Sequence, residues 1–99
     1  MALYVLALAV DVRIPEAHSL TEKRSVVRTI LDGAQRRFGA STAETGLLDV
    51  HQRSELGFVV AAGTAAHAVE RIDSVERFVW SFPEIEVVAT ERHWMEVVR

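Results

Sequence analysis

The side chains best suited to chemistry in this sequence are basic, and they cluster in one segment. Between positions 13 and 37 there are six Lys and Arg residues and three Asp and Glu residues, a net charge of +3. The other residues carry −6, so the net charge of −3 for the 99-residue chain conceals a basic region. Arg24 and Arg28 share one face of the helix expected there, with Lys23 beside the apolar stripe. Phosphate or an acidic partner suits such a face, and the alternative is a solvated face that keeps the protein soluble.

Catalytic and metal-binding patterns are absent from the sequence. The four His residues include no pair spaced for a metal site, and there is no Cys to bind zinc or to act as a nucleophile. No phosphate-binding loop, dinucleotide-binding turn or serine nucleophile motif occurs. Glu44 and Asp49 form a single pair of acids near a predicted hairpin, which is weak evidence for acid–base catalysis. We therefore expect a protein without catalytic activity, metal or cofactor.

The composition is typical of one folded domain. Hydrophobic residues make up 49% and charged residues 25% of the chain, enough apolar side chain to stabilise a core. The apolar run at positions 1–10 is interrupted by Asp11 and Arg13, well short of the roughly 20 residues that span a bilayer. No basic residue precedes this run, as one would in an export signal. These features predict one domain over residues 1–99 and a cytoplasmic location.

Hydrophobic periodicity predicts six elements. In order they are a strand, a helix, two strands, a helix and a strand, over residues 2–13, 19–39, 41–50, 54–63, 64–83 and 84–93. Residues 49–53 are expected to connect the second and third strands. Ser19 and Glu22 form a capping box for the first helix and Gly39 suits its C-terminal cap, while Thr64 caps the second helix.

The end of the chain is less regular. In the last strand we expect Ile85, Val87 and Ala89 to face the core. The residues that follow, among them Trp94 and Met95, are expected to form a short apolar tail.

This order of elements predicts a ferredoxin-like α+β fold, with a four-stranded antiparallel sheet and two helices on one face. The first and third strands are the most apolar and are expected at the centre. The opposite face of the sheet is then open and lined by small apolar residues: Ala7, Ala9, Gly57, Val59, Ala61 and Val88. A monomer seldom leaves such a face bare, so we expect a second copy or another partner there. The alternative is that the C-terminal tail covers it.

The same outward positions limit the ways in which RNA could bind. An RNA-recognition motif stacks bases on aromatic residues of its central strands, whereas this chain has Ala, Gly and Val there. The GxxG loop of a KH domain is also missing. If RNA is bound, we expect phosphate contacts from the first helix and from Arg53, with modest sequence specificity and strong salt dependence.

Two segments resemble a known family. Residues 14–24 read Ile-Pro-Glu-Ala-His-Ser-Leu-Thr-Glu-Lys-Arg, and residues 49–57 contain an Asp, a Gln-Arg pair and a Leu-Gly pair. In this combination the chain resembles the YlxP-like family of small bacterial proteins of unknown function, over essentially its whole length. The resemblance implies a ferredoxin-like fold. Because such proteins tend to be encoded near translation factors and ribosome-binding factors, it also implies a role near ribosome maturation or translation, with no known reaction or cofactor.

The positions that match the family pattern divide by role. Capping explains Ser19 and Glu22, and packing explains Leu20. The other matching side chains, with Arg28 from the same helix face, form the predicted binding site: His18, Lys23, Arg24, Arg28, Gln52 and Arg53. His51 stands where the related proteins often have Trp next to Gln-Arg, so at this position the chain departs from the family pattern.

Two functional hypotheses follow. The first is a non-enzymatic accessory protein that contacts rRNA or a ribosomal particle through the basic helix and the hairpin. The second is a homodimeric protein-interaction or small-ligand module that uses the open sheet face, centred on Ala7, Ala9, Val59 and Ala61. Neither involves a membrane or a metal. Because an exposed charge pair contributes less than about 1 kcal/mol, replacing Lys23 and Arg24 by Gln is expected to leave stability nearly unchanged.

Overall fold

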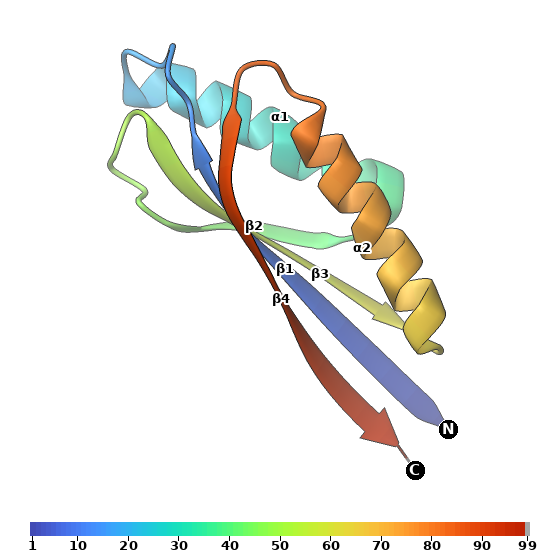
Figure 1. Ribbon diagram of the computed structural model, residues 1–99. Helices are drawn as coiled ribbons and strands as arrows, with labels where there is room; N and C mark the ends of the chain where they lie inside the picture. The colour runs from blue at the N-terminus through green and yellow to red at the C-terminus, as the bar shows by residue number, and fades with distance from the viewer. Residues whose placement is uncertain (99) are drawn as a thin grey trace.

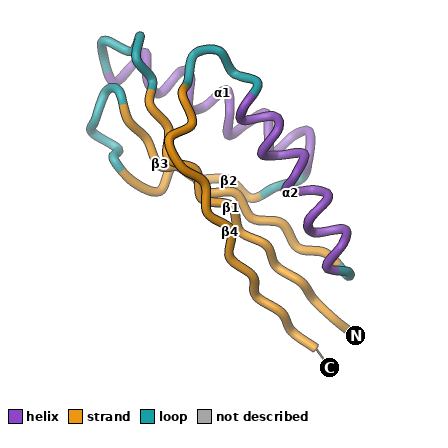
Figure 2. The backbone as a smooth tube through the Cα atoms, in the orientation of Figure 1, coloured by secondary structure: helices purple, strands orange, loops and turns teal. Residues whose placement is uncertain are grey.

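The chain folds into one four-stranded sheet covered by two helices, in a computed structural model that describes residues 1–98 (Figure 1). The elements are β1 (Ala2–Arg13), α1 (Leu20–Phe38), β2 (Ser41–Gly46), β3 (Arg53–Ala62), α2 (Ala65–Trp80) and β4 (Glu86–Val98). The strands are antiparallel in the order β2-β3-β1-β4, and both helices lie on the same face (Figure 2). The predicted ferredoxin-like fold, with β1 and β3 at the centre, is confirmed.

The core lies between the central strands and the helices. Every second residue of β1 and β3 points to this side, and Leu6, Leu8, Leu56 and Phe58 are fully buried there. The helices contribute Val27, Ile30, Ala34, Ala68, Ile72, Val75 and Val79 from their inner faces. Removing a Leu or Phe side chain of this kind from water contributes roughly 1.5–3 kcal/mol. Burial of these apolar side chains therefore holds the helices against the sheet, and they are the residues whose periodicity predicted the elements.

The helix ends follow the predicted caps. The hydroxyl of Ser19 accepts a hydrogen bond from the backbone N–H of Glu22 at 3.1 Å, and the Glu22 carboxylate accepts one from the backbone N–H of His18. Gly39 ends α1 with a φ of 65°, in the left-handed region that favours glycine. The Thr64 hydroxyl caps α2 by accepting from the backbone N–H of His67 at 3.1 Å. These contacts fix where each helix begins and where α1 ends.

Several boundaries differ from the prediction. β2 ends at Gly46, and residues 47–52 form the turn to β3. The predicted apolar tail is instead the second half of β4, in which Trp94 pairs with Leu6 and Met95 with Val5. A tail that covers the open face of the sheet is therefore wrong, because these residues extend the sheet at its edge. α2 ends at Trp80, before the predicted boundary.

A β-bulge in β4 explains a second difference. The register of β1 and β4 shifts between Asp11 and Val12, so that Val12 pairs with Val87 and Asp11 with Ala89. Val88 is the extra residue between them and is half exposed. One extra residue moves every later side chain to the opposite face of the sheet. Ala89 therefore lies on the open face, and the expectation that it faces the core is wrong.

The two helices approach each other at a glycine. A Cβ atom on Gly33 of α1 would lie 2.5 Å from Cζ of Phe78 in α2. The Phe78 ring is held between Phe38 and Phe82, whose ring centroids lie 5.7 and 5.0 Å away in edge-to-face contacts. The ring consequently has little room to move away, and the close approach requires a residue without a side chain.

Substituting Gly33→Val tests this contact. We expect a loss of about 1–3 kcal/mol in the free energy of unfolding, because the added carbons overpack the helix interface. The measurement is urea unfolding followed by circular dichroism. Gln35→Val, which places the same side chain at an exposed position of α1, is the control and should change stability by a few tenths of that amount. Equal effects for the two variants would contradict the packing role.

Candidate functional site

Lys23 lies inside the protein. Lys23 is 0% exposed, although this lysine belongs to the basic segment that was predicted to contact phosphate. The Lys23 ammonium donates hydrogen bonds to the backbone oxygens of Leu47 at 2.6 Å and Leu48 at 3.2 Å, and its Nζ lies 2.8 Å from the Glu44 carboxylate. These three partners match the three protons of the ammonium. Lys23 therefore holds the structure together, and the prediction that it binds phosphate at the surface is corrected.

Glu44 extends this contact across the sheet. The carboxylate oxygen that faces Lys23 also accepts a hydrogen bond from the hydroxyl of Ser54, at 2.6 Å. Ser54 is fully buried, and its partner Glu44 lies on the edge strand β2. The set formed by Lys23, Glu44, Ser54 and the two carbonyls of residues 47 and 48, here called the lysine network, thus joins α1, β2, β3 and the turn between the strands.

Gln52 holds the C-terminal end of the turn at residues 47–52. Its side-chain nitrogen lies 3.1 Å from the backbone oxygen of Pro15 and 3.4 Å from that of Ala17. The backbone N–H of Ile14 donates to the backbone oxygen of Gln52 at 2.9 Å. The turn at 47–52 is therefore tied to the segment that leads into α1. The side-chain nitrogen of Gln52, a member of the predicted binding site, is therefore engaged in this structural role.

Arg53 is paired with an acid. Its guanidinium lies 2.8 Å from each carboxylate oxygen of Asp11, its neighbour on β1. The side chain of Arg53 is 36% exposed, so part of it still reaches the surface. His18 is exposed, and its structural contact is made by its backbone through Glu22. Arg53 and His18 therefore remain accessible, but Asp11 offsets the charge of Arg53.

Unlike Lys23 and Arg53, three arginines on the outward side of α1 have no acidic partner in the described part of the chain. Within residues 1–98, Arg24, Arg28 and Arg36 are exposed and make no ion pair, side-chain hydrogen bond or ring contact. The other described basic residues all have a partner, including Arg37, whose guanidinium lies 5.0 Å from the centroid of the Phe78 ring. Arg36 was absent from the predicted site, although its position on the polar side of the helix could have indicated it.

Hydroxyl groups line the same surface. A shallow hollow of about 320 Å³ is bounded by Arg24, Arg28 and the hydroxyl residues Thr21, Ser25 and Thr29. Guanidinium and hydroxyl groups are the side-chain donors most used for phosphate oxygens. We call the exposed residues Thr21, Arg24, Ser25, Arg28 and Arg36 the α1 arginine face. It is the one surface of the described chain where unpaired positive charges gather.

The structure also brings together the residues of the other predicted surface, the open face of the sheet. Ala7 pairs with Val59 and Ala9 with Gly57, so their side chains share the face opposite the helices. Ala9, Val59 and Ala61 are exposed and Ala7 is half-buried. A hollow of about 470 Å³ lies at one end of this face, where its lining includes the carboxylates of residues 11, 55 and 91. The open face therefore carries acidic side chains at one end.

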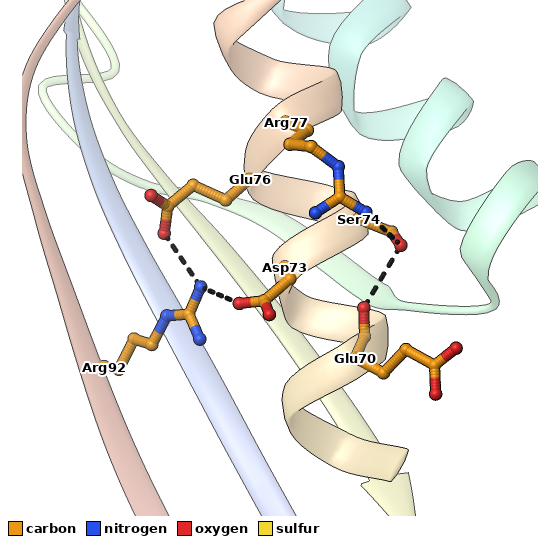
Figure 3. A network of polar contacts seen from close by, with 6 residues as sticks. All are labelled: Glu70, Asp73, Ser74, Glu76, Arg77 and Arg92. Atoms are coloured by element: carbon orange, nitrogen blue, oxygen red, sulfur yellow. Dashed lines mark hydrogen bonds and ion pairs between the residues drawn. The ribbon is translucent and has the colours of Figure 1, made fainter. Parts of the chain in front are cut away.

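Arg92 connects β4 to α2. Its guanidinium lies 2.8 Å from the Asp73 carboxylate and 3.1 Å from that of Glu76 (Figure 3). Partial burial lowers the pKa of Arg92, but hydrogen bonds and the charges of Asp73 and Glu76 outweigh burial and raise that pKa above its ordinary value. Arg92 stays charged and holds the edge strand against the helix, and the two carboxylates already offset its charge.

Comparison with known proteins identifies the family. Residues 5–92 match the family described as "Protein of unknown function (DUF503)". The chain belongs to the DUF503 family. It is also similar to the "Uncharacterized protein YlxP" of Bacillus subtilis (strain 168), with 36% identity over 79 residues, which cover 80% of this chain and 86% of that protein. The predicted YlxP-like resemblance is confirmed.

Family membership supplies no activity, since the family is described as of unknown function and the relative as uncharacterized. Within residues 1–98, no group of three or more His, Asp or Glu side chains is placed to hold a metal ion. Neither helix of this DUF503 protein is long and apolar enough to cross a membrane, over the part of the chain that is described. The two surfaces described above, the α1 arginine face and the open face of the sheet, are therefore the candidate sites of function.

The lysine network predicts that Lys23 and Arg24 behave differently, which corrects the expectation that replacing both leaves stability nearly unchanged. Lys23→Met should lower the free energy of unfolding by about 3–5 kcal/mol, because it leaves the Glu44 carboxylate without its buried counter-charge. Arg24→Met, the matched control on the exposed side, should change it by no more than about 0.5 kcal/mol. Chemical unfolding followed by tryptophan fluorescence measures both.

A double-mutant cycle separates the ion pair from general packing. Combining Lys23→Met with Glu44→Gln should cost less than the sum of the two single changes, by about 0.5–3 kcal/mol. Additive effects would show that the two side chains act independently and would contradict the network.

Proposed function

We propose that this DUF503 protein is an accessory protein that docks on RNA of a ribosomal particle through the α1 arginine face. The supporting observation is the distribution of partners among the basic residues. Arg24, Arg28 and Arg36 are unpaired within the described chain, whereas the remaining described cations are engaged in ion pairs, hydrogen bonds or a ring contact. An unpaired exposed arginine retains its full capacity to bind a phosphate.

The arrangement of the face suits an extended polyanion. Arg24 and Arg36 are twelve residues apart on one straight helix, which is about 18 Å along its axis. Arg28 lies between them on the same i, i+4 row of the helix, and the exposed Asp32 lies on this row between Arg28 and Arg36. A phosphate backbone presents repeated negative charges along a line of this kind. A single small anion would engage only one or two of the three groups.

The charge of the rest of the protein orients the approach. The segment from residue 13 to residue 37 carries +3, while the remaining residues carry −6. An RNA surface therefore attracts the face of α1 and repels most of the remaining surface. Binding of this type is modest in strength and falls as salt is added, because each phosphate contact releases a counterion.

The double variant Arg24→Gln/Arg28→Gln tests the proposal. Removing two phosphate contacts should weaken binding to ribosomal RNA fragments at low salt. It should also reduce the slope of log K against log salt by about 1.4, the value for two contacts to single-stranded RNA. Filter binding over a series of salt concentrations gives both quantities.

A matched control removes the same charge elsewhere. Arg13→Gln/Arg77→Gln changes two exposed arginines outside α1, and it should leave the slope close to that of the unmodified protein. If both double variants lower the slope equally, net charge alone determines binding. If the unmodified protein binds no ribosomal RNA even at low salt, the proposal is wrong.

A second candidate is a homodimeric protein-interaction or small-ligand module that uses the open face of the sheet. The specific support is that Ala9, Val59 and Ala61 are exposed and adjacent, with Val59 38% exposed. Small side chains at these positions would allow another surface to approach the backbone closely.

Ala9→Glu tests this second candidate. A dimer formed through the open face should dissociate, because a carboxylate would be buried at the centre of the contact. Light scattering of the unmodified protein and of the variant gives the molar mass. A dimer that persists in Ala9→Glu excludes this face as the site of self-association.

A further inference from the structure

β4 is the long open edge of the sheet. It contains 13 residues, whereas the other edge strand, β2, has six and an irregular register with β3. From Ala2–Val98 to Asp11–Ala89 the pairing of β1 with β4 is regular, and the bulge lies only at the start of the strand. In the described chain nothing pairs with the outer side of β4, which Figure 1 and Figure 2 show at the border of the sheet. Such an edge presents a row of backbone donors and acceptors to another strand.

The second half of this edge is only partly protected against pairing. It contains neither Pro, Lys nor a bulge, although it carries the charged residues Glu91, Arg92 and Glu96. Two large apolar side chains are exposed in its second half, Trp94 at 50% and Met95 at 57%. They lie on opposite faces, because Trp94 pairs with the buried Leu6 and Met95 with its neighbour Val5. Each face of this part of the edge therefore exposes one large apolar side chain among charged or polar neighbours.

We propose that β4 pairs antiparallel with β4 of a second copy of this chain, with the two Trp94 residues opposite each other. In this register Arg92 faces the second copy's Glu96, and the reciprocal pair forms on the other side of the two-fold axis. Opposite charges directly across an antiparallel pair are stabilising, and Glu96 would share the Arg92 guanidinium with Asp73 and Glu76 of the same chain as Arg92. The sequence of β4 is thus complementary to itself around Trp94.

Neighbouring registers lose this complementarity. Centring the pair on Arg92 places two guanidinium groups opposite each other, and like charges in that position are destabilising. Centring it on His93 places Glu91 opposite Met95 and Thr90 opposite Glu96, so no opposite charges meet. The register is therefore specified by charge, while Trp94 and Met95 supply the apolar contact.

The pairing also agrees with the fold. A two-fold axis normal to the sheet keeps residues of one face together, and it places all four helices on the same side of an eight-stranded sheet. Arg92 already holds β4 against α2 through Asp73 and Glu76, so the edge strand is positioned before it meets its partner (Figure 3). Both α1 arginine faces then lie on the helix side of one particle. The dimer itself does not depend on the proposed RNA binding.

The absence of cysteine from the sequence allows a direct test by cross-linking. Directly opposite Cβ atoms of an antiparallel pair lie about 4.5–5.5 Å apart, close to the span of a disulfide. Trp94→Cys at the two-fold axis should therefore become a disulfide-linked dimer under mild oxidation. Trp80→Cys is the matched control, because Trp80 is also an exposed tryptophan (58%) but lies on α2. It should remain a single chain on a non-reducing gel.

A second pair of variants tests the apolar contact without cross-linking. Sedimentation equilibrium at micromolar concentration should show a dimer for the unmodified protein and for Trp80→Lys, and loss of the dimer for Trp94→Lys. A monomeric unmodified protein would overturn the proposal. So would a dimer that Ala9→Cys, on the open face, cross-links while Trp94→Cys does not.

Discussion

The buried ion pair between Lys23 and Glu44 is the contact on which the junction of α1, β2, β3 and the turn at residues 47–52 depends. A charged side chain removed from water is strongly destabilising unless it is paired and hydrogen-bonded. Here each proton of the ammonium has a partner, and the carboxylate has a second donor in Ser54. The pair thus locates the start of α1 relative to β2 and β3. This contact therefore also positions the N-terminal part of the α1 arginine face, because Arg24 directly follows Lys23.

The same contact accounts for the shape of the turn after β2. Leu47 has a φ of 58°, a conformation that is uncommon for a residue with a side chain. The backbone oxygens of Leu47 and Leu48 accept from Lys23 and so leave the ladder of β2, which ends at Gly46. Gln52 holds the other end of the turn. Two parts of the family pattern, the Lys of residues 14–24 and the Gln of the Gln-Arg pair, thereby meet in one structural unit.

Local periodicity and capping chemistry were enough to predict the fold. The order of elements, the central position of β1 and β3, and the caps at Ser19, Gly39 and Thr64 all depend on residues close together in the chain. The bulge at Val88 could not be predicted, because simple alternation from Ile85 fits the sequence equally well. The continuation of β4 through Trp94 depends on pairing with β1, a partner distant in the sequence.

The candidate site could be predicted only in part for the same reason. Arg24 and Arg28 were found from their spacing, and they are exposed as expected. Lys23 was misplaced because burial of its ammonium is decided by Glu44 and by carbonyls more than twenty residues away. Arg53 and Asp11 are also partners from different strands, 42 residues apart. A charge read from sequence gives no indication of whether a distant partner has already engaged it.

The most direct test of the central claim, that α1 carries the unengaged charges while Lys23 belongs to the architecture, is a nuclear magnetic resonance titration. Backbone amide and arginine side-chain signals would be followed as a short single-stranded RNA is added at low salt. We expect the largest shifts at Arg24, Arg28 and Arg36 and their neighbours on the outward side of α1, with the ammonium of Lys23 unaffected. Largest shifts on the open face of the sheet, or no shifts on α1, would contradict this claim.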